Sequence, residues 1–123
     1  MQKIIDIGFC TLKFYKNYMI TTINEGVHVD KEQNEALIKI AENYYSNQPF
    51  VYISHRVNSY SVNPNVYPRT SKTKNLAGLA VVTHDYKAKR NAQIEKLFLH
   101  KPFEIFATLT EAFNWADELI SNS

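Results

Sequence analysis

The feature that most constrains the fold is a short apolar run, Leu76–Asp85, which reads LAGLAVVTHD. Small and branched apolar residues fill its first part, and a polar tripeptide closes it. Such a run is typical of a strand buried on both faces of a sheet, because a strand with one exposed face would alternate polar and apolar residues. Gly78 and the alanines leave room for close helix packing. The sequence therefore predicts a central strand, Ala77–Thr83, with helices above and below it.

The length and composition favour one globular domain covering residues 1–123. The chain is 45% hydrophobic and 21% charged, which is ordinary for a globular protein that buries a real core. No apolar run approaches the roughly 18 residues that span a membrane, and Asp6 interrupts the apolar start that a signal peptide would need. We therefore expect a cytoplasmic protein with no membrane span. Cys10 is the only cysteine, so we expect no disulfide and a small buried hydrophobic side chain.

The net charge of +2 conceals an asymmetry. Residues 69–101 carry eight Lys and Arg against two Asp and Glu, a balance of +6, whereas the remainder carries six against ten, a balance of −4. This basic segment marks either an anionic partner or the solvated face of a helix and loop. Tyr86 is the only aromatic residue between Arg69 and Arg90, so we expect no nucleic-acid platform here.

The N-terminal part predicts an antiparallel hairpin, Thr11–Ile23, because two β-favouring runs flank the polar tip Lys16-Asn17. Residues 27–29 are expected to extend its second strand past a bulge or turn. The exposed edge of this hairpin either pairs with a second copy, in which case we expect a homodimer, or needs covering by another segment.

A helix is predicted to follow at Asp30. Asp30 is its N-cap and Gln33 completes a capping box. The helix ends at Ser46–Pro49, and its buried face is formed by Ala36, Leu37, Ile40, Ala41 and Tyr44.

Alternating strands and helices are predicted for the remainder. Phe50–His55 and Phe103–Phe106 have the composition of strands. Arg56–Asn75 is expected to form a loop or a short irregular helix, with Asn63-Pro64 at one helix start and Pro68 limiting it. Two longer helices are also predicted. The first is capped by Asp85, ends at His100, and has the inward residues Ala88, Asn91, Ile94, Leu97 and Phe98. The second begins with a capping box of Thr108 and Glu111 and has the inward residues Ala112, Phe113, Ala116, Leu119 and Ile120.

This order of elements predicts an α/β sandwich. We expect a mixed sheet of about five strands with an N-terminal antiparallel hairpin, later parallel strands joined by right-handed crossovers, and about four helices.

The local sequence also resembles a known fold. Four segments carry the resemblance: Leu79–Val82, Asn91–Phe98, Lys101–Phe106 and Thr110–Trp115. They are similar to the SpoIIAA-like or STAS-type fold, and more narrowly to the small bacterial proteins of this type grouped with CRAL-TRIO-like lipid-transfer domains. The resemblance implies a non-enzymatic regulatory domain that acts through protein contacts. Its CRAL-TRIO-like side implies, as the alternative, a carrier of a small apolar or lipid-like ligand.

STAS-type regulators carry a phosphorylatable serine in a turn after the middle strand, and the resemblance places Ser59 and Ser61 there. The acid before that serine and the glycine after it are missing from this sequence. Ser59 and Ser61 are therefore candidates for a switch, or else turn and capping residues.

Other chemistry is weakly indicated. The four histidines have no metal-ligand spacing, and three glycines cannot form a phosphate loop. Five tyrosines near the first helix and middle strand either line an apolar pocket or fill the core: Tyr44, Tyr45, Tyr52, Tyr60 and Tyr67. We expect no enzyme activity, no metal and no cofactor; an enzymatic reading would depend on His84-Asp85 alone. The predicted contact surface with an unknown protein comprises Tyr60, Tyr67, Arg69, His84, Asp85 and Lys87.

Overall fold

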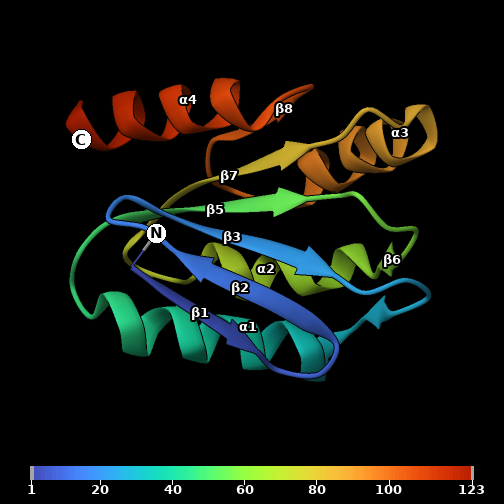
Figure 1. Ribbon diagram of the computed structural model, residues 1–123, viewed down its shortest axis with the longest axis horizontal. Coiled ribbons are helices and arrows are strands. Elements are labelled where there is room, and N and C mark those ends of the chain that lie inside the picture. The colour runs from blue at the N-terminus through green and yellow to red at the C-terminus, as the bar shows by residue number, and fades with distance from the viewer. Residues whose placement is uncertain (1, 123) are drawn as a thin grey trace.

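The computed structural model describes residues 2–122. Its main feature is a six-stranded mixed sheet in the order β1-β2-β3-β5-β7-β8 (Figure 1). The four strands from β3 to β8 are parallel, and β1, β2 and β3 are antiparallel. The strands are β1 (Lys3–Asp6), β2 (Cys10–Phe14), β3 (Tyr18–Ile23), β5 (Phe50–His55), β7 (Leu76–Val82) and β8 (Phe103–Phe106). The predicted α/β class and the antiparallel hairpin are therefore confirmed, with six strands rather than five.

Helices cover both faces of the sheet. α4 lies alone on one face, whereas α1 and α2 lie on the other (Figure 1). α3 packs on the same face as α2, through a cluster that Ala92 shares with Tyr67 and Phe103. The helices are α1 (Lys31–Tyr45), α2 (Tyr67–Ser71), α3 (Tyr86–Glu95) and α4 (Leu109–Ser121), with short 3-10 turns at Pro64–Val66 and Lys96–Phe98.

The edge of the hairpin is covered, which is the second of the two alternatives predicted for it. β1 pairs with β2 along its whole length, from Lys3 opposite Phe14 to Asp6 opposite Thr11. The argument for a dimer through the Thr11–Ile23 edge therefore fails, because that edge already has a partner. Residues 27–29 are also placed differently: β4 (His28–Val29) leaves the main sheet and pairs in parallel with β6 (Ser61–Val62).

The predicted helix caps are confirmed. Asp30 and Gln33 form the capping box of α1, and Thr108 and Glu111 form that of α4. Asp85 caps α3 by accepting a hydrogen bond from the Ala88 amide. The buried face of α1 is rotated by about one residue from the prediction and comprises Leu37, Ile38, Ala41 and Tyr45. α2 begins at Tyr67, because Pro68 occupies its first turn, where an amide hydrogen is not needed.

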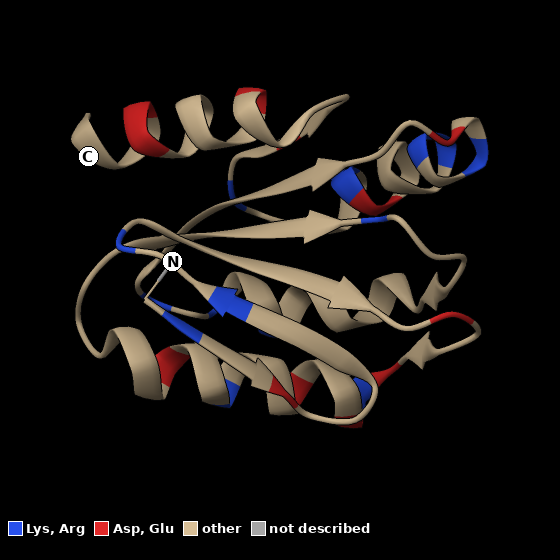
Figure 2. Cartoon of the chain, viewed as in Figure 1, with Lys and Arg blue, Asp and Glu red and all other residues tan. Residues whose placement is uncertain are grey.

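Charge is concentrated on α3. Figure 2 shows several Lys and Arg residues on this helix, at one end of the sheet. α1, by comparison, carries both signs. No helix among the described residues has the length and apolar character needed to cross a bilayer.

β7 is buried on both faces, as its sequence predicted, and Gly78 lets α4 approach it closely. A Cβ at Gly78 would lie 2.8 Å from Leu119 Cδ2 and 3.0 Å from both the Pro102 carbonyl oxygen and Trp115 Cη2. A Cβ at 2.8 Å would force the Leu119 side chain to move, and the two contacts at 3.0 Å would require smaller shifts of their neighbours. The absence of a side chain at position 78 therefore allows the close approach of the helix to the sheet.

We predict that Gly78→Ala lowers the free energy of unfolding by about 1–3 kcal/mol, because the added methyl overpacks the interface. Urea denaturation measures this loss. In the double variant Gly78→Ala/Leu119→Ala, the Leu119 methyl that clashes with the new Cβ is absent. The double variant should therefore lose less stability than the sum of the losses measured for Gly78→Ala and Leu119→Ala separately. Strictly additive losses would contradict the steric explanation.

Cys10 is 1% exposed, and burial, followed by the nearby Asp6 charge, raises the pKa of its thiol from 9.0 to about 12. We therefore predict that a disulfide reagent at about pH 8 labels Cys10 only after unfolding, since the thiolate is the reactive form. As the pH rises, the thiol ionises at a lower pH in the unfolded chain than in the folded protein. Above about pH 9 this difference favours the unfolded state, so Cys10 lowers the free energy of unfolding there. Labelling of the native protein at the rate of the unfolded chain would contradict this burial.

Candidate interaction groove

A groove of about 870 Å³ lies between the segment after β5 and α3. Its walls come from residues 56–62 and Pro64, from Glu25–Val27, and from the side of α3 that faces these segments. β5 ends at His55 and β7 ends at Val82, so the groove adjoins the carboxyl ends of two neighbouring parallel strands. Open α/β sheets commonly bind their ligands at this edge.

A buried ion pair between Arg56 and Glu95 contributes to this groove. The two guanidinium nitrogens Nη1 and Nη2 donate to Glu95 Oε2 and Oε1 at 2.8 and 2.6 Å. The side chains are only 6% and 5% exposed. The Tyr67 hydroxyl donates a further hydrogen bond to Glu95 Oε1. The pair therefore joins the end of β5 to α3 and, through Tyr67, to α2.

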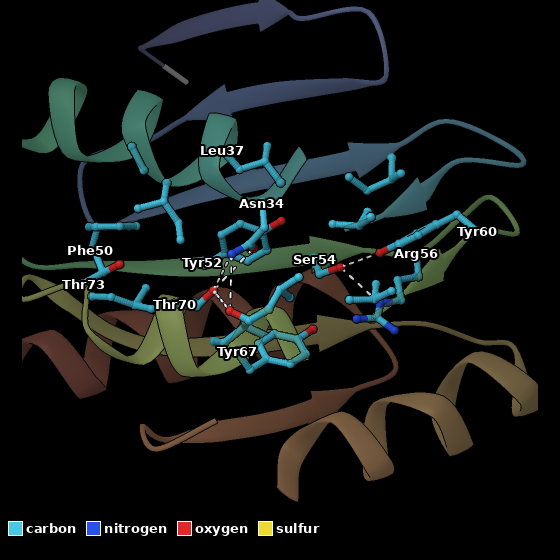
Figure 3. Close-up of a pocket in the computed structure, with 18 residues that line it drawn as sticks. Asn34, Leu37, Phe50, Tyr52, Ser54, Arg56, Tyr60, Tyr67, Thr70 and Thr73 are labelled. Carbon is cyan, nitrogen blue, oxygen red and sulfur yellow. Dashed lines mark hydrogen bonds between the residues drawn. The ribbon is translucent and has the colours of Figure 1, made fainter. Parts of the chain in front are cut away.

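The same guanidinium also organises the segment after β5. Arg56 Nε donates to Ser54 Oγ at 3.2 Å, and Ser54 Oγ lies 2.9 Å from the Tyr60 hydroxyl (Figure 3). The Arg56 guanidinium carbon is also 5.5 Å from the centre of the Tyr60 ring, within range of a cation–π interaction. These contacts hold Tyr60 against the sheet.

The protonation states of this cluster follow from its surroundings. Burial, the largest single influence, acts to lower the pKa of Arg56, but the hydrogen bond to Glu95 and the electrostatic interactions with Tyr60, Glu95 and Tyr67 together outweigh it, so the pKa is raised and the guanidinium stays charged. Burial and the adjacent Glu95 carboxylate raise the pKa of Tyr67 well above its ordinary value. The Tyr67 phenol therefore remains a donor to Glu95 across the physiological range.

Sequence reasoning missed Glu95 because it chose the wrong face of α3. The predicted inward residues Ile94 and Leu97 are 52% and 79% exposed. The face that packs inward instead carries Ala92 and Glu95, followed by Leu99. A signal was present, because Ala88, Ala92, Glu95 and Leu99 follow helical spacing, but a charged residue at an inward position hid it.

Five of the residues predicted to act as a switch or a contact surface lie in the groove wall: Ser59, Tyr60, Ser61, Asp85 and Lys87. The other three lie outside it. Tyr67 is 5% exposed and contacts Glu95, so it does not belong to an exposed surface. Arg69 pairs with Glu35 on α1 at 3.0 Å. His84 is exposed just before α3.

The two candidate switch serines are both exposed. The Ser59 amide donates to Glu25 Oε1 at 2.9 Å. Ser61 Oγ lies 2.7 Å from His28 Nδ1, and His28 Nε2 lies 3.8 Å from Asp30 Oδ2. This order resembles a Ser-His-Asp array, but the second distance is too long for a hydrogen bond and both side chains are more than half exposed. The geometry therefore does not activate Ser61 as a nucleophile.

A separate cavity of about 40 Å³ lies beneath α1 and α2 (Figure 3). Tyr52, Tyr60 and Tyr67 line it together with apolar side chains such as Leu37 and Phe50. The Thr73 hydroxyl is buried and has no hydrogen-bond partner among residues 2–122. The volume is about a quarter of the ~150 Å³ apolar cavity that accepts benzene, so it suits a few water molecules.

Comparison with known proteins supports the fold assignment. No protein-family model and no curated protein matches the sequence. Among solved structures, the chain is similar to an uncharacterized protein of the DUF3478 family with a SpoIIAA-like fold, from Shewanella loihica PV-4. The match covers 87% of this chain and 91% of that chain, with a TM-score of 0.56 and 12% identity. The chain therefore has a SpoIIAA-like fold, as the resemblance predicted; at this identity the likeness establishes the fold alone.

We predict that Glu95→Ala lowers the free energy of unfolding by about 3–5 kcal/mol, because it leaves the Arg56 charge buried without a partner. Urea denaturation followed by Trp115 fluorescence measures the loss. The double variant Arg56→Met/Glu95→Leu, which removes both charges, should recover most of it. Glu118→Ala, an exposed glutamate on α4, is the control and should change stability by less than about 0.5 kcal/mol. Equal stability of Glu95→Ala and Glu118→Ala would contradict the importance of this pair.

Proposed function

We propose that this protein is a non-enzymatic regulatory domain that binds a segment of another protein in the groove between residues 56–64 and α3. The observation that carries the proposal is the position of the groove: it adjoins the carboxyl ends of β5 and β7 and has a rigid, hydrogen-bonded base. A binding surface that is held in place loses little conformational entropy when a partner binds.

The chemistry of the walls also supports a protein ligand. Polar side chains that offer both donors and acceptors alternate with apolar ones. The polar group comprises Asn58, Ser59, Ser61, Lys87 and Asn91, and the apolar group comprises Val27, Val57, Val62, Pro64 and Ile94. Mixed walls of this kind suit a peptide, which presents backbone amides together with side chains. In this proposal, modification of Ser59 or Ser61 would add negative charge to one wall and change the partner that the groove accepts.

The alternative, a carrier of an apolar ligand, would use the cavity beneath α1 and α2. That space is about 40 Å³, so a lipid-like molecule would enter only after these helices moved apart. The Arg69 pair with Glu35 and the contact of Asn34 Nδ2 with Thr70 Oγ1 at 3.0 Å hold α1 to α2. The groove is therefore the better supported site.

We predict that a photo-crosslinking residue at Ser59 or Asn91, on opposite walls of the groove, captures the same partner in the producing cells. The same residue at Asn43, exposed on α1, is the control. Asn91→Trp should obstruct the groove and abolish capture from Ser59, whereas Asn43→Trp should not. Capture from all three positions alike, or capture from Ser59 that survives Asn91→Trp, would contradict the groove as the binding site.

A further inference from the structure

The outward side of α3 and of the 3-10 turn that follows it carries three large apolar side chains that face solvent. Tyr86 is 75% exposed, Ile94 52% and Leu97 79%. Together with Arg90 these residues follow one another at i, i+4, i+8 and i+11, which is the spacing of one helical face; Leu97 lies in the 3-10 turn Lys96–Phe98 that continues α3. They account for three of the exposed large hydrophobic side chains among the described residues. We call this set (Tyr86, Arg90, Ile94 and Leu97) the α3 stripe.

Cations surround the stripe. Lys87, Lys89, Arg90 and Lys96 are all exposed. The only acidic residue between Tyr86 and Leu97 is Glu95, which is buried against Arg56. The Arg90 guanidinium carbon lies 5.9 Å from the Tyr86 ring centre, so even the aromatic end of the stripe carries positive charge. Figure 2 shows this basic helix at the outer corner of the molecule.

We propose that the α3 stripe docks the protein on an anionic membrane surface. This inference goes beyond the proposed function and is argued from different observations, although Ile94 belongs to both surfaces. A helix with apolar side chains on its outer face and lysine or arginine on both sides is the pattern of interfacial helices, whose apolar side chains enter the headgroup region. Positive charge on the protein complements the negative charge of phosphatidylglycerol or phosphatidylserine.

The exposure of the stripe favours a bilayer over a folded partner. Tyr86 and Leu97 retain three quarters or more of their surface, so they protrude rather than line a depression. A protein partner would need a matching pocket for each protruding side chain, whereas fluid headgroups accommodate them without a preformed complement. The binding is expected to be reversible and sensitive to salt, because the helix is short and each cation near the surface strengthens binding only about fivefold.

The test is co-sedimentation of the purified full chain with vesicles of phosphatidylcholine alone, or with about one third phosphatidylglycerol. We expect binding to the anionic vesicles only, lost at high salt. Tyr86→Ser/Ile94→Ser/Leu97→Ser and, separately, Lys89→Glu/Arg90→Glu should each reduce the bound fraction by about tenfold or more. These residues are exposed, so the variants should keep the native circular dichroism spectrum.

Two controls match these variants. Ile4→Ser removes an equally exposed isoleucine, 53% accessible on β1, and Lys31→Glu/Lys39→Glu reverses two exposed charges on α1; neither should weaken binding comparably. Absence of vesicle binding, equal binding to neutral vesicles, or equal losses in the controls would overturn the proposal. Loss of photo-capture at Ser59 in the stripe variants, with vesicle binding unchanged, would also overturn it and assign α3 to a protein partner. Loss of photo-capture in Asn91→Trp alone supports the groove as the protein-binding site and leaves the membrane proposal unchanged.

Discussion

The arrangement of this end of the molecule depends on one buried interaction, the ion pair between Arg56 and Glu95. Removing two charges from water costs several kcal/mol for each ion, and this cost is offset only when geometry and hydrogen bonding are good. Here the pair is bidentate, and Ser54 and Tyr67 supply further hydrogen bonds. Because these groups come from β5, α2 and α3, their mutual satisfaction fixes three elements relative to one another.

The same pair explains why α3 exposes apolar side chains. Successive helical residues are separated by about 100°, so placing Glu95 inward turns Ile94 toward solvent and leaves Leu97 on the outer side. A rotation that buried Ile94 and Leu97 would leave Arg56 buried without its carboxylate. An unpaired buried charge costs about 3–5 kcal/mol, which offsets much of the gain of about 1.5–3 kcal/mol from burying each of these two side chains. Electrostatics in the interior therefore contribute to the character of the outer surface.

The elements that the sequence predicted well are those specified by neighbouring residues. The capping residues Asp30, Asp85 and Thr108 act within one helical turn, and the unbroken apolar run of β7 reflects burial on both faces. The rotation of α3 was predicted wrongly because it depends on Arg56, which is 39 residues away along the chain. The pairing of β4 with β6 was missed for a similar reason, since each strand has two residues and takes its partner from a distant segment.

In the candidate site, too, the features that depend on chain order were predicted and those that depend on distant contacts were not. Ser59, Tyr60, Ser61, Asp85 and Lys87 were placed at this end of the sheet because they follow strands or open a helix, and topology alone brings such positions together. Tyr67 was misplaced because a tyrosine beside a proline-rich turn gives no sign of a buried carboxylate partner. No local pattern in the sequence distinguishes a tyrosine that points outward from one that donates its hydroxyl to Glu95.

The groove and the α3 stripe share part of α3. Ile94 belongs to the stripe and also lines the groove, and Lys87 lies beside both. A side chain inserted among lipid headgroups is not simultaneously available to a peptide in the groove. Binding at one surface therefore changes the affinity at the other, and thermodynamic linkage makes the effect equal in both directions. On this argument, the membrane and the protein partner compete for α3, and occupancy of the groove releases the domain from the bilayer.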